Sequence, residues 1–192
     1  MGLFDRLLGR SIDKEKQPSV KFGRYSDAYK SDEQYVAWQE SMDLFEQGKH
    51  FESYENFFKY LGDTQEDTVT FQRLGDTHLD FEILQGSKRI QGYVDGRKFK
   101  ATVKVAKATE LNVGFMRRLI EKNFTLKHSR YGLDEGNHVV MIFDTYLLDG
   151  SPHKLYHALN ELATSADKMD DLLIEEFEML EPVGNEHVKD LP

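Results

Sequence analysis

One pair among the seven histidines has the spacing of a metal site. His153 and His157 lie four residues apart in HKLYH, so on a helix their imidazoles share one face. Helical zinc proteases place a general-base glutamate directly after the first such histidine, whereas this chain has Lys154. Two solvated histidines on an amphipathic helix are the simpler interpretation, and we predict no metal site.

Paired carboxylates are the second candidate for chemistry. Asp170-Asp171 and Glu175-Glu176 lie in an acidic run, and neighbours on a helix do not face one another across a cleft. The chain has no GxSxG motif, no P-loop, no GxGxxG motif and no cysteine. We therefore predict no catalytic residue, no cofactor and no enzymatic activity.

Composition indicates a folded chain in a reducing compartment. The 192 residues suit one domain with appendages, and 39% of them are hydrophobic. No run approaches the roughly 18 apolar residues of a membrane span, and no secretion signal is evident. Together with the missing cysteines, this predicts a cytoplasmic protein.

Charge is unevenly distributed within the net value of −9. Residues 161–192 hold ten acidic residues against two lysines, whereas residues 73–130 hold thirteen Lys or Arg against six acids. The basic middle could bind nucleic acid, and this stays the alternative function. It could equally attract the acidic part, within one chain or across a dimer. The expected exposed sheet face lacks interleaved aromatic residues on which bases stack, so nucleic acid is the less favoured partner.

An aromatic helical hairpin is expected over residues 32–62. Ser31-Asp32-Glu33-Gln34 has the spacing of a capping box, and apolar residues then recur every three or four positions up to Gly48 and again up to Gly62. This hairpin could close the core or present a surface to another polypeptide. For the second alternative, the candidate partner-binding residues are Trp38, Tyr54, Phe57, Phe58 and Tyr60.

An antiparallel meander is expected next. Four runs of strand-like sequence, separated by two-residue turns, show alternating apolar and polar residues, so one sheet face is buried. The runs are 68–74, 77–85, 88–94 and 97–106.

Two helices and a second strand pair complete the expected domain. Asn112 can cap a helix with Met116, Leu119, Ile120 and Asn123 on one side. Strands at 124–131 and 138–147 follow. Ser151-Pro152 then starts a long helix whose apolar spacing continues to Leu180.

From Leu79 onward this order resembles the type III secretion chaperones and the related YbjN-like bacterial domains. The resemblance is carried by the alternating meander, by MRRLIEKNF, by the apolar run after His138 and by HALNELATSADKMDDLL, over residues 77–180. It implies an α+β fold: an antiparallel meander covered by helices, here with an added N-terminal helical hairpin. It also implies a bacterial homodimer, chaperone-like or adaptor in kind, that binds polypeptide segments through apolar surface and catalyses nothing.

The expected organisation is one domain with two appendages. An N-terminal arm and linker covers residues 1–31, and the α+β domain covers 32–181, with its chaperone-like core at 68–181. A flexible tail covers 182–192. In the arm, one side of a two-turn helix would be apolar, and it could dock on a polypeptide partner, touch a membrane surface or stay loose. Its candidate contact residues are Leu3, Phe4, Leu7 and Leu8.

Overall fold

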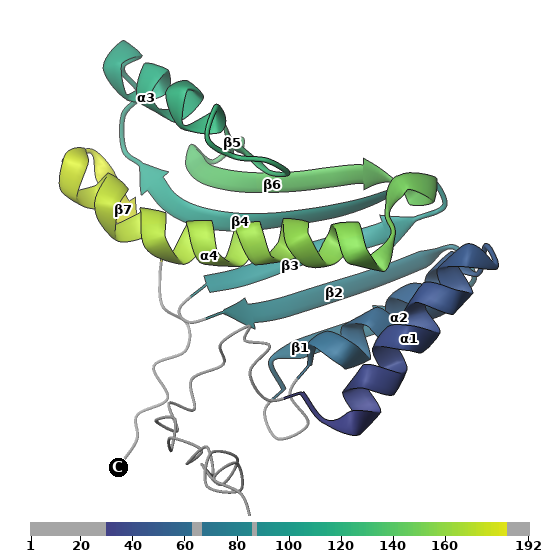
Figure 1. Cartoon of the computed structure of the whole chain (residues 1–192). Helices are drawn as coiled ribbons and strands as arrows, with labels where there is room; N and C mark the ends of the chain where they lie inside the picture. Colours follow the sequence, from purple (N-terminus) through teal and green to yellow (C-terminus); the bar gives the residue numbers. More distant parts are fainter. Residues whose placement is uncertain (1–29, 63–66, 86–87, 184–192) are drawn as a thin grey trace, which may run out of the picture.

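The computed structural model describes residues 30–62, 67–85 and 88–183 (Figure 1). Within these ranges the chain forms four α-helices, one 3₁₀ turn and a seven-stranded antiparallel sheet. The predicted α+β class with a helix-covered meander is therefore confirmed. No helix in the described ranges is long and apolar enough to cross a membrane.

Helices α1 (Asp32–Glu46) and α2 (His50–Leu61) form the predicted hairpin. The capping box at Ser31 is present, since the Ser31 backbone N–H donates to Gln34 Oε1 at 2.9 Å and the Gln34 N–H donates to Ser31 Oγ at 3.2 Å. Gly48 turns the chain with a φ of 77°, which glycine adopts without strain. The buried Gln34 amide also donates to Tyr60 O at 3.1 Å and so joins the two helices.

The meander forms four of the seven strands: β1 (Val69–Arg73), β2 (His78–Gln85), β3 (Lys88–Asp95) and β4 (Lys98–Ala108). The strand order is β1-β2-β3-β4-β6-β5. Strands β5 (Arg130–Leu133) and β6 (His138–Tyr146) follow helix α3 (Val113–Asn123). The apolar run in β6 lies between β4 and β5, as its composition predicts.

The second half of the chain differs from expectation at three places. Residues 124–129 form no strand, because the backbone N–H groups of residues 127–129 bind Glu161 rather than a neighbouring strand. Helix α4 (Pro152–Glu176), which follows the turn η2 (Leu147–Asp149), ends before Leu180. Leu180 instead begins a short strand that the sequence did not predict, β7 (Leu180–Pro182), which pairs with the end of β4.

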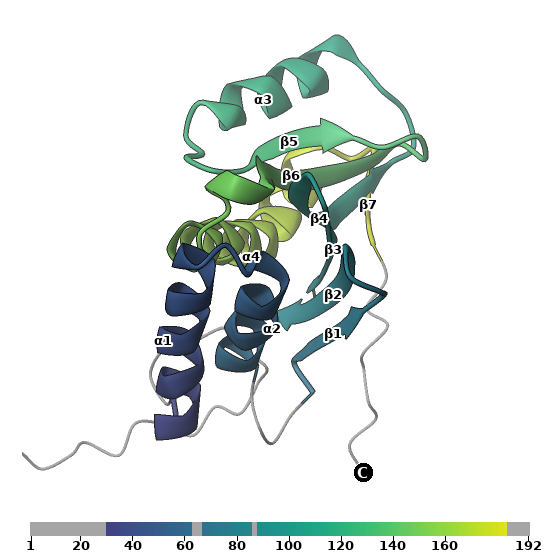
Figure 2. The same cartoon turned by 90° about the vertical axis from the view of Figure 1, so that its right-hand side faces the viewer.

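The helices lie mainly on one side of the sheet. Figure 2 shows α1, α2 and α4 on the same side, while α3 lies beyond β5. The alternation of burial along β2 and β4 matches this one-sided cover. Helix α3 does not lie on that face, because it packs beside β5 and the end of α4.

Candidate protein-binding surface

Helix α3 is amphipathic in an unusual way, because it has two apolar sides. The Asn112 side chain caps the helix, with Oδ1 accepting a hydrogen bond from the Phe115 N–H at 2.9 Å. Phe115 and Leu119, one turn apart, are buried, and the Phe115 ring meets Phe177 at a centroid distance of 5.3 Å. This inner side attaches α3 to the end of α4.

The outer side of α3 carries an exposed apolar surface. Val113 is 85% exposed, Ile120 59% and Phe124 87%. With Leu111 and Met116 they follow helical spacing, and four of these five residues line one shallow hollow. We call this set the α3 stripe: Leu111, Val113, Met116, Ile120 and Phe124. Single exposed apolar residues are ordinary, but a contiguous group marks an interaction site.

Two polar contacts fix the position of α3, one at its middle and one at its C-terminal end. Arg118 Nε lies 2.9 Å from a carboxylate oxygen of Glu176 at the end of α4. The Asn123 side chain accepts the Tyr131 N–H at 2.6 Å and lies 3.4 Å from Tyr131 O. Asn123 thus occupies polar backbone groups of β5, a strand that pairs only with β6 among the described strands.

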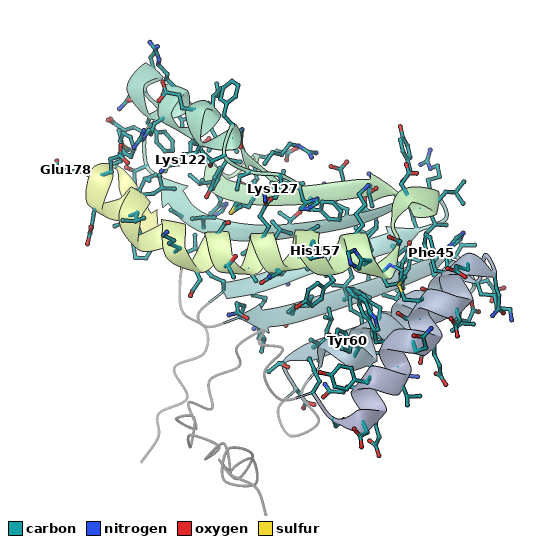
Figure 3. All side chains as sticks on the ribbon, viewed as in Figure 1. Phe45, Tyr60, Lys122, Lys127, His157 and Glu178 are labelled. Carbon is teal, nitrogen blue, oxygen red and sulfur yellow. The ribbon has the colours of Figure 1, made fainter. Side chains whose placement is uncertain are left out.

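Glu161 holds the loop between α3 and β5. Its carboxylate accepts the backbone N–H groups of Lys127, His128 and Ser129 at 2.8 to 3.0 Å, and the Ser129 hydroxyl at 2.6 Å. Figure 3 shows Lys127 next to α4, from which Glu161 projects. Partial burial raises the pKa of Glu161, but the hydrogen bonds from Ser129, Lys127 and His128 outweigh it, so the pKa lies below its ordinary value. We call this arrangement the Glu161 clamp.

The hairpin aromatics predicted to bind a partner lie mostly in the core rather than on the surface. Tyr54, Phe57 and Phe58 are fully buried, Tyr60 is nearly so, and Trp38 is half-buried. The Phe58 ring packs on Phe81 at 4.6 Å. The Tyr54 hydroxyl donates to Leu147 O at 3.1 Å, and burial raises the pKa of Tyr54 above its ordinary value. Of the two alternatives for the hairpin, the structure therefore supports closure of the core, because these rings pack on the apolar face of β2 and β4.

The other candidates in the arm lie outside the described residues. These are Leu3, Phe4, Leu7 and Leu8, and their proposed role stays a prediction.

The basic residues of the middle segment do not form one isolated positive surface. Lys98, Lys100 and Lys104 project from the uncovered side of β4, whereas Arg117, Arg118 and Lys122 belong to α3. Several basic residues of the middle segment form ion pairs with acidic residues. The pairs are Arg89–Glu82 at 3.1 Å, Arg130–Asp144 at 2.6 Å, Lys104–Asp134 at 4.0 Å, Arg117–Glu121 at 3.2 Å and Arg118–Glu176 at 2.9 Å. These pairings reduce the positive potential that a polyanion would meet.

The histidines and carboxylates considered for chemistry all belong to helix α4. Glu176 forms an ion pair with Arg118 at 2.9 Å. No three His, Asp or Glu side chains gather around a possible metal position among the described residues. His153 and His157 lie on the exposed side of α4 with ring centroids 4.7 Å apart.

Sequence reasoning missed the α3 stripe although a signal was available. An eleven-residue helix whose apolar residues extend over more than one side cannot bury all of them against one neighbour. The spacing alone predicts Met116, Leu119, Ile120 and Asn123 on one side of the helix. The structure buries Leu119 and exposes Ile120.

Comparisons with known proteins give structural matches only. No family model and no curated protein matches the chain. Solved structures that are similar to it include the following three. One is the heterodimeric ExoU–SpcU complex from the type III secretion system of Pseudomonas aeruginosa, with 11% identity, 58% of this chain and 88% of that chain covered, and a TM-score of 0.34. Another is the ExsC–ExsE complex, with 15% identity, 55% and 75% covered, and a TM-score of 0.35. The third is the Yersinia pestis type III secretion chaperone SycH in complex with a stable fragment of YscM2, with 16% identity, 67% and 98% covered, and a TM-score of 0.35.

The resemblance to type III secretion chaperones stated from the sequence is found again by this comparison, at the level of fold. These matches show the fold alone.

Proposed function

We propose that the protein is a non-enzymatic protein-binding module, an adaptor or chaperone-like protein of the bacterial cytoplasm, that works as a homodimer. The observation that carries this proposal is the α3 stripe, a contiguous apolar surface on a helix held at its middle by Arg118 and at its C-terminal end by Asn123. An exposed apolar surface costs solubility unless something covers it. The stripe is the described surface best suited to a protein contact.

A second copy of the chain is the occupant we propose for the stripe. Arg117 and Glu121 border the hollow of the stripe and lie one helical turn apart. When two α3 helices cross antiparallel about a two-fold axis, Arg117 of each copy meets Glu121 of the other. The apolar centre and the charged border are then both self-complementary, as a two-fold interface requires.

The expected dimer is of moderate strength. Burying an exposed Ile or Phe side chain contributes about 1.5 to 3 kcal/mol, and the stripe offers few such residues. Stable complexes bury about 800 Å² on each partner, so residues around the stripe must contribute as well. We expect self-association in the micromolar range.

A two-tag capture experiment tests the interface. Two copies with different tags are produced together, and one tag is used for purification. Wild type should retain the second copy, whereas Ile120→Glu in both copies should lose it, because a carboxylate would be buried in the contact. Leu148→Glu is the matched control, since Leu148 is 76% exposed and lies outside the stripe. Retention by the Ile120→Glu pair would show that the stripe is not the interface.

The adaptor role has a separate test. Tagged wild-type protein is purified from its own organism's lysate at moderate salt after nuclease treatment. We expect one polypeptide to be retained in near-stoichiometric amount, and to survive a salt increase that removes nucleic acid. Recovery of the homodimer without another polypeptide would contradict the adaptor role. The homodimer itself is tested separately, by the two-tag experiment.

A further inference from the structure

The two histidines at the start of α4 are the strongest feature that the proposed function leaves unexplained. His153 and His157 occupy the first two turns of the helix, on its exposed side (Figure 3 labels His157). Neither imidazole makes a hydrogen bond or an ion pair with a residue in the described ranges. Both are therefore available to an external ligand.

The separation of the two rings fits cis coordination of one metal ion. Metal–nitrogen bonds of about 2.0 Å, ring nitrogens about 1.1 Å from the ring centre and ligand angles of about 90 to 109° place two bound imidazole centres about 4.4 to 5.1 Å apart. The observed centroid separation is 4.7 Å. Rotation about the broad Cβ–ring torsions can turn a nitrogen of each ring toward a common point without moving the helix.

The surroundings favour a borderline metal ion over a hard one. Lys154, which replaces the glutamate of a zinc protease, turns away and donates its Nζ to Thr145 Oγ1 at 2.8 Å. Aromatic rings form the neighbouring surface, since Tyr156 contacts both His157 and Trp38. Calcium and magnesium require oxygen ligands, whereas imidazole suits zinc, nickel and copper.

We propose that His153 and His157 bind one divalent first-row transition ion, with Cu²⁺ held more tightly than Ni²⁺ or Zn²⁺. The prediction of no metal site followed from the missing glutamate, but that residue serves proteolysis and not binding. Two protein ligands leave the other coordination positions to water. The site is independent of the α3 stripe, which belongs to a different helix.

Calorimetric titration of the full chain, without a polyhistidine tag, with Ni²⁺ or Cu²⁺ tests the site. We expect one ion per chain in the tightest class of sites. His153→Gln and His157→Gln should each weaken that class about tenfold or more, because the second imidazole binds intramolecularly once the first is engaged. The control is His128→Gln, an exposed histidine of the loop before β5 that is not one of the two proposed ligands, and it should stay within about twofold of wild type.

A second measurement guards against loss of folding. Metal bound only by the folded chain raises its melting temperature. Wild type and His128→Gln should show this rise. Without metal, His153→Gln and His157→Gln should have the melting temperature of metal-free wild type, and added metal should not raise it. The proposal would be overturned if wild type and His157→Gln bound the metal with equal affinity. It would also be overturned if the chain had several equivalent sites and each histidine substitution removed one bound ion.

Discussion

At the scale of single residues, Glu161 joins two parts of the chain that are distant in sequence. It accepts four hydrogen bonds from three consecutive residues across a separation of more than thirty positions. Glu161→Ala should lower the free energy of unfolding by about 2 kcal/mol, because charged hydrogen bonds are lost and the part-buried Ser129 hydroxyl loses its acceptor. Urea unfolding followed by circular dichroism measures this. Glu175→Ala, at an exposed position of the same helix, should change stability by less than about 0.5 kcal/mol.

The Glu161 clamp should also depend on pH in a defined direction. Its folded pKa lies below the ordinary value of 4.5, so the clamp stabilises the fold fully above that value. As pH falls through the lower folded pKa, the carboxylate is protonated and this contribution is lost. The stability difference between wild type and Glu161→Gln should therefore shrink below pH 4.5. A difference that stayed constant down to pH 2 would show that the charge of Glu161 is unimportant.

At the scale of elements, Gly92 allows β2, β3 and β4 to pack under the helices. A Cβ there would lie 2.2 Å from the Phe81 ring and 2.2 Å from Lys100 O. Gly92→Ala should cost about 3 kcal/mol or prevent folding, because the backbone of β4 would have to move. Gly96→Ala has no neighbour within 4 Å and is the control. Equal thermal midpoints for the two variants would contradict this account of the sheet.

Asn123 should control how firmly β5 and α3 are joined. Asn123→Ala removes the acceptor of the Tyr131 N–H, so hydrogen exchange at that amide should become about tenfold faster or more. Asn56→Ala is the comparison, because the Asn56 amide bonds only within its own helix, to Glu52 O at 3.0 Å. Unchanged exchange at Tyr131 would mean that other contacts hold this edge.

The elements differ in how far the sequence predicted them, and the reason is local. The capping box at Ser31, the cap at Asn112 and the Ser151-Pro152 start act within one turn, and all three are present. The strand expected over 124–131 begins only at Arg130, because Glu161, which lies far away in sequence, binds the backbone N–H groups of residues 127–129. The exposure of the hairpin rings was wrong for the same kind of reason, since pairing of α2 with the sheet decides it. Long-range contacts of this kind leave no periodic signal in one chain.

At the scale of the whole molecule, one ion pair joins the acidic C-terminal part to the basic middle among the described residues. Arg118 of α3 pairs with Glu176 of α4, whereas Arg130 pairs with Asp144, which lies outside residues 161–192. Attraction within one chain, one of the alternatives that the sequence left open, is present at the first of these contacts. The uncovered side of the sheet is mixed in sign, whereas the α3 stripe is apolar. Association through the stripe should therefore tolerate salt.

Sedimentation equilibrium of the full chain over a range of concentrations tests the central claim most directly. The account predicts an average mass that rises toward twice 22.3 kDa with concentration and changes little with added salt. Ile120→Glu should stay at the monomer mass with an unchanged circular dichroism spectrum, and Leu148→Glu should behave as wild type. A wild-type chain that remained at 22.3 kDa at the highest concentration would contradict the claim that the α3 stripe joins two copies.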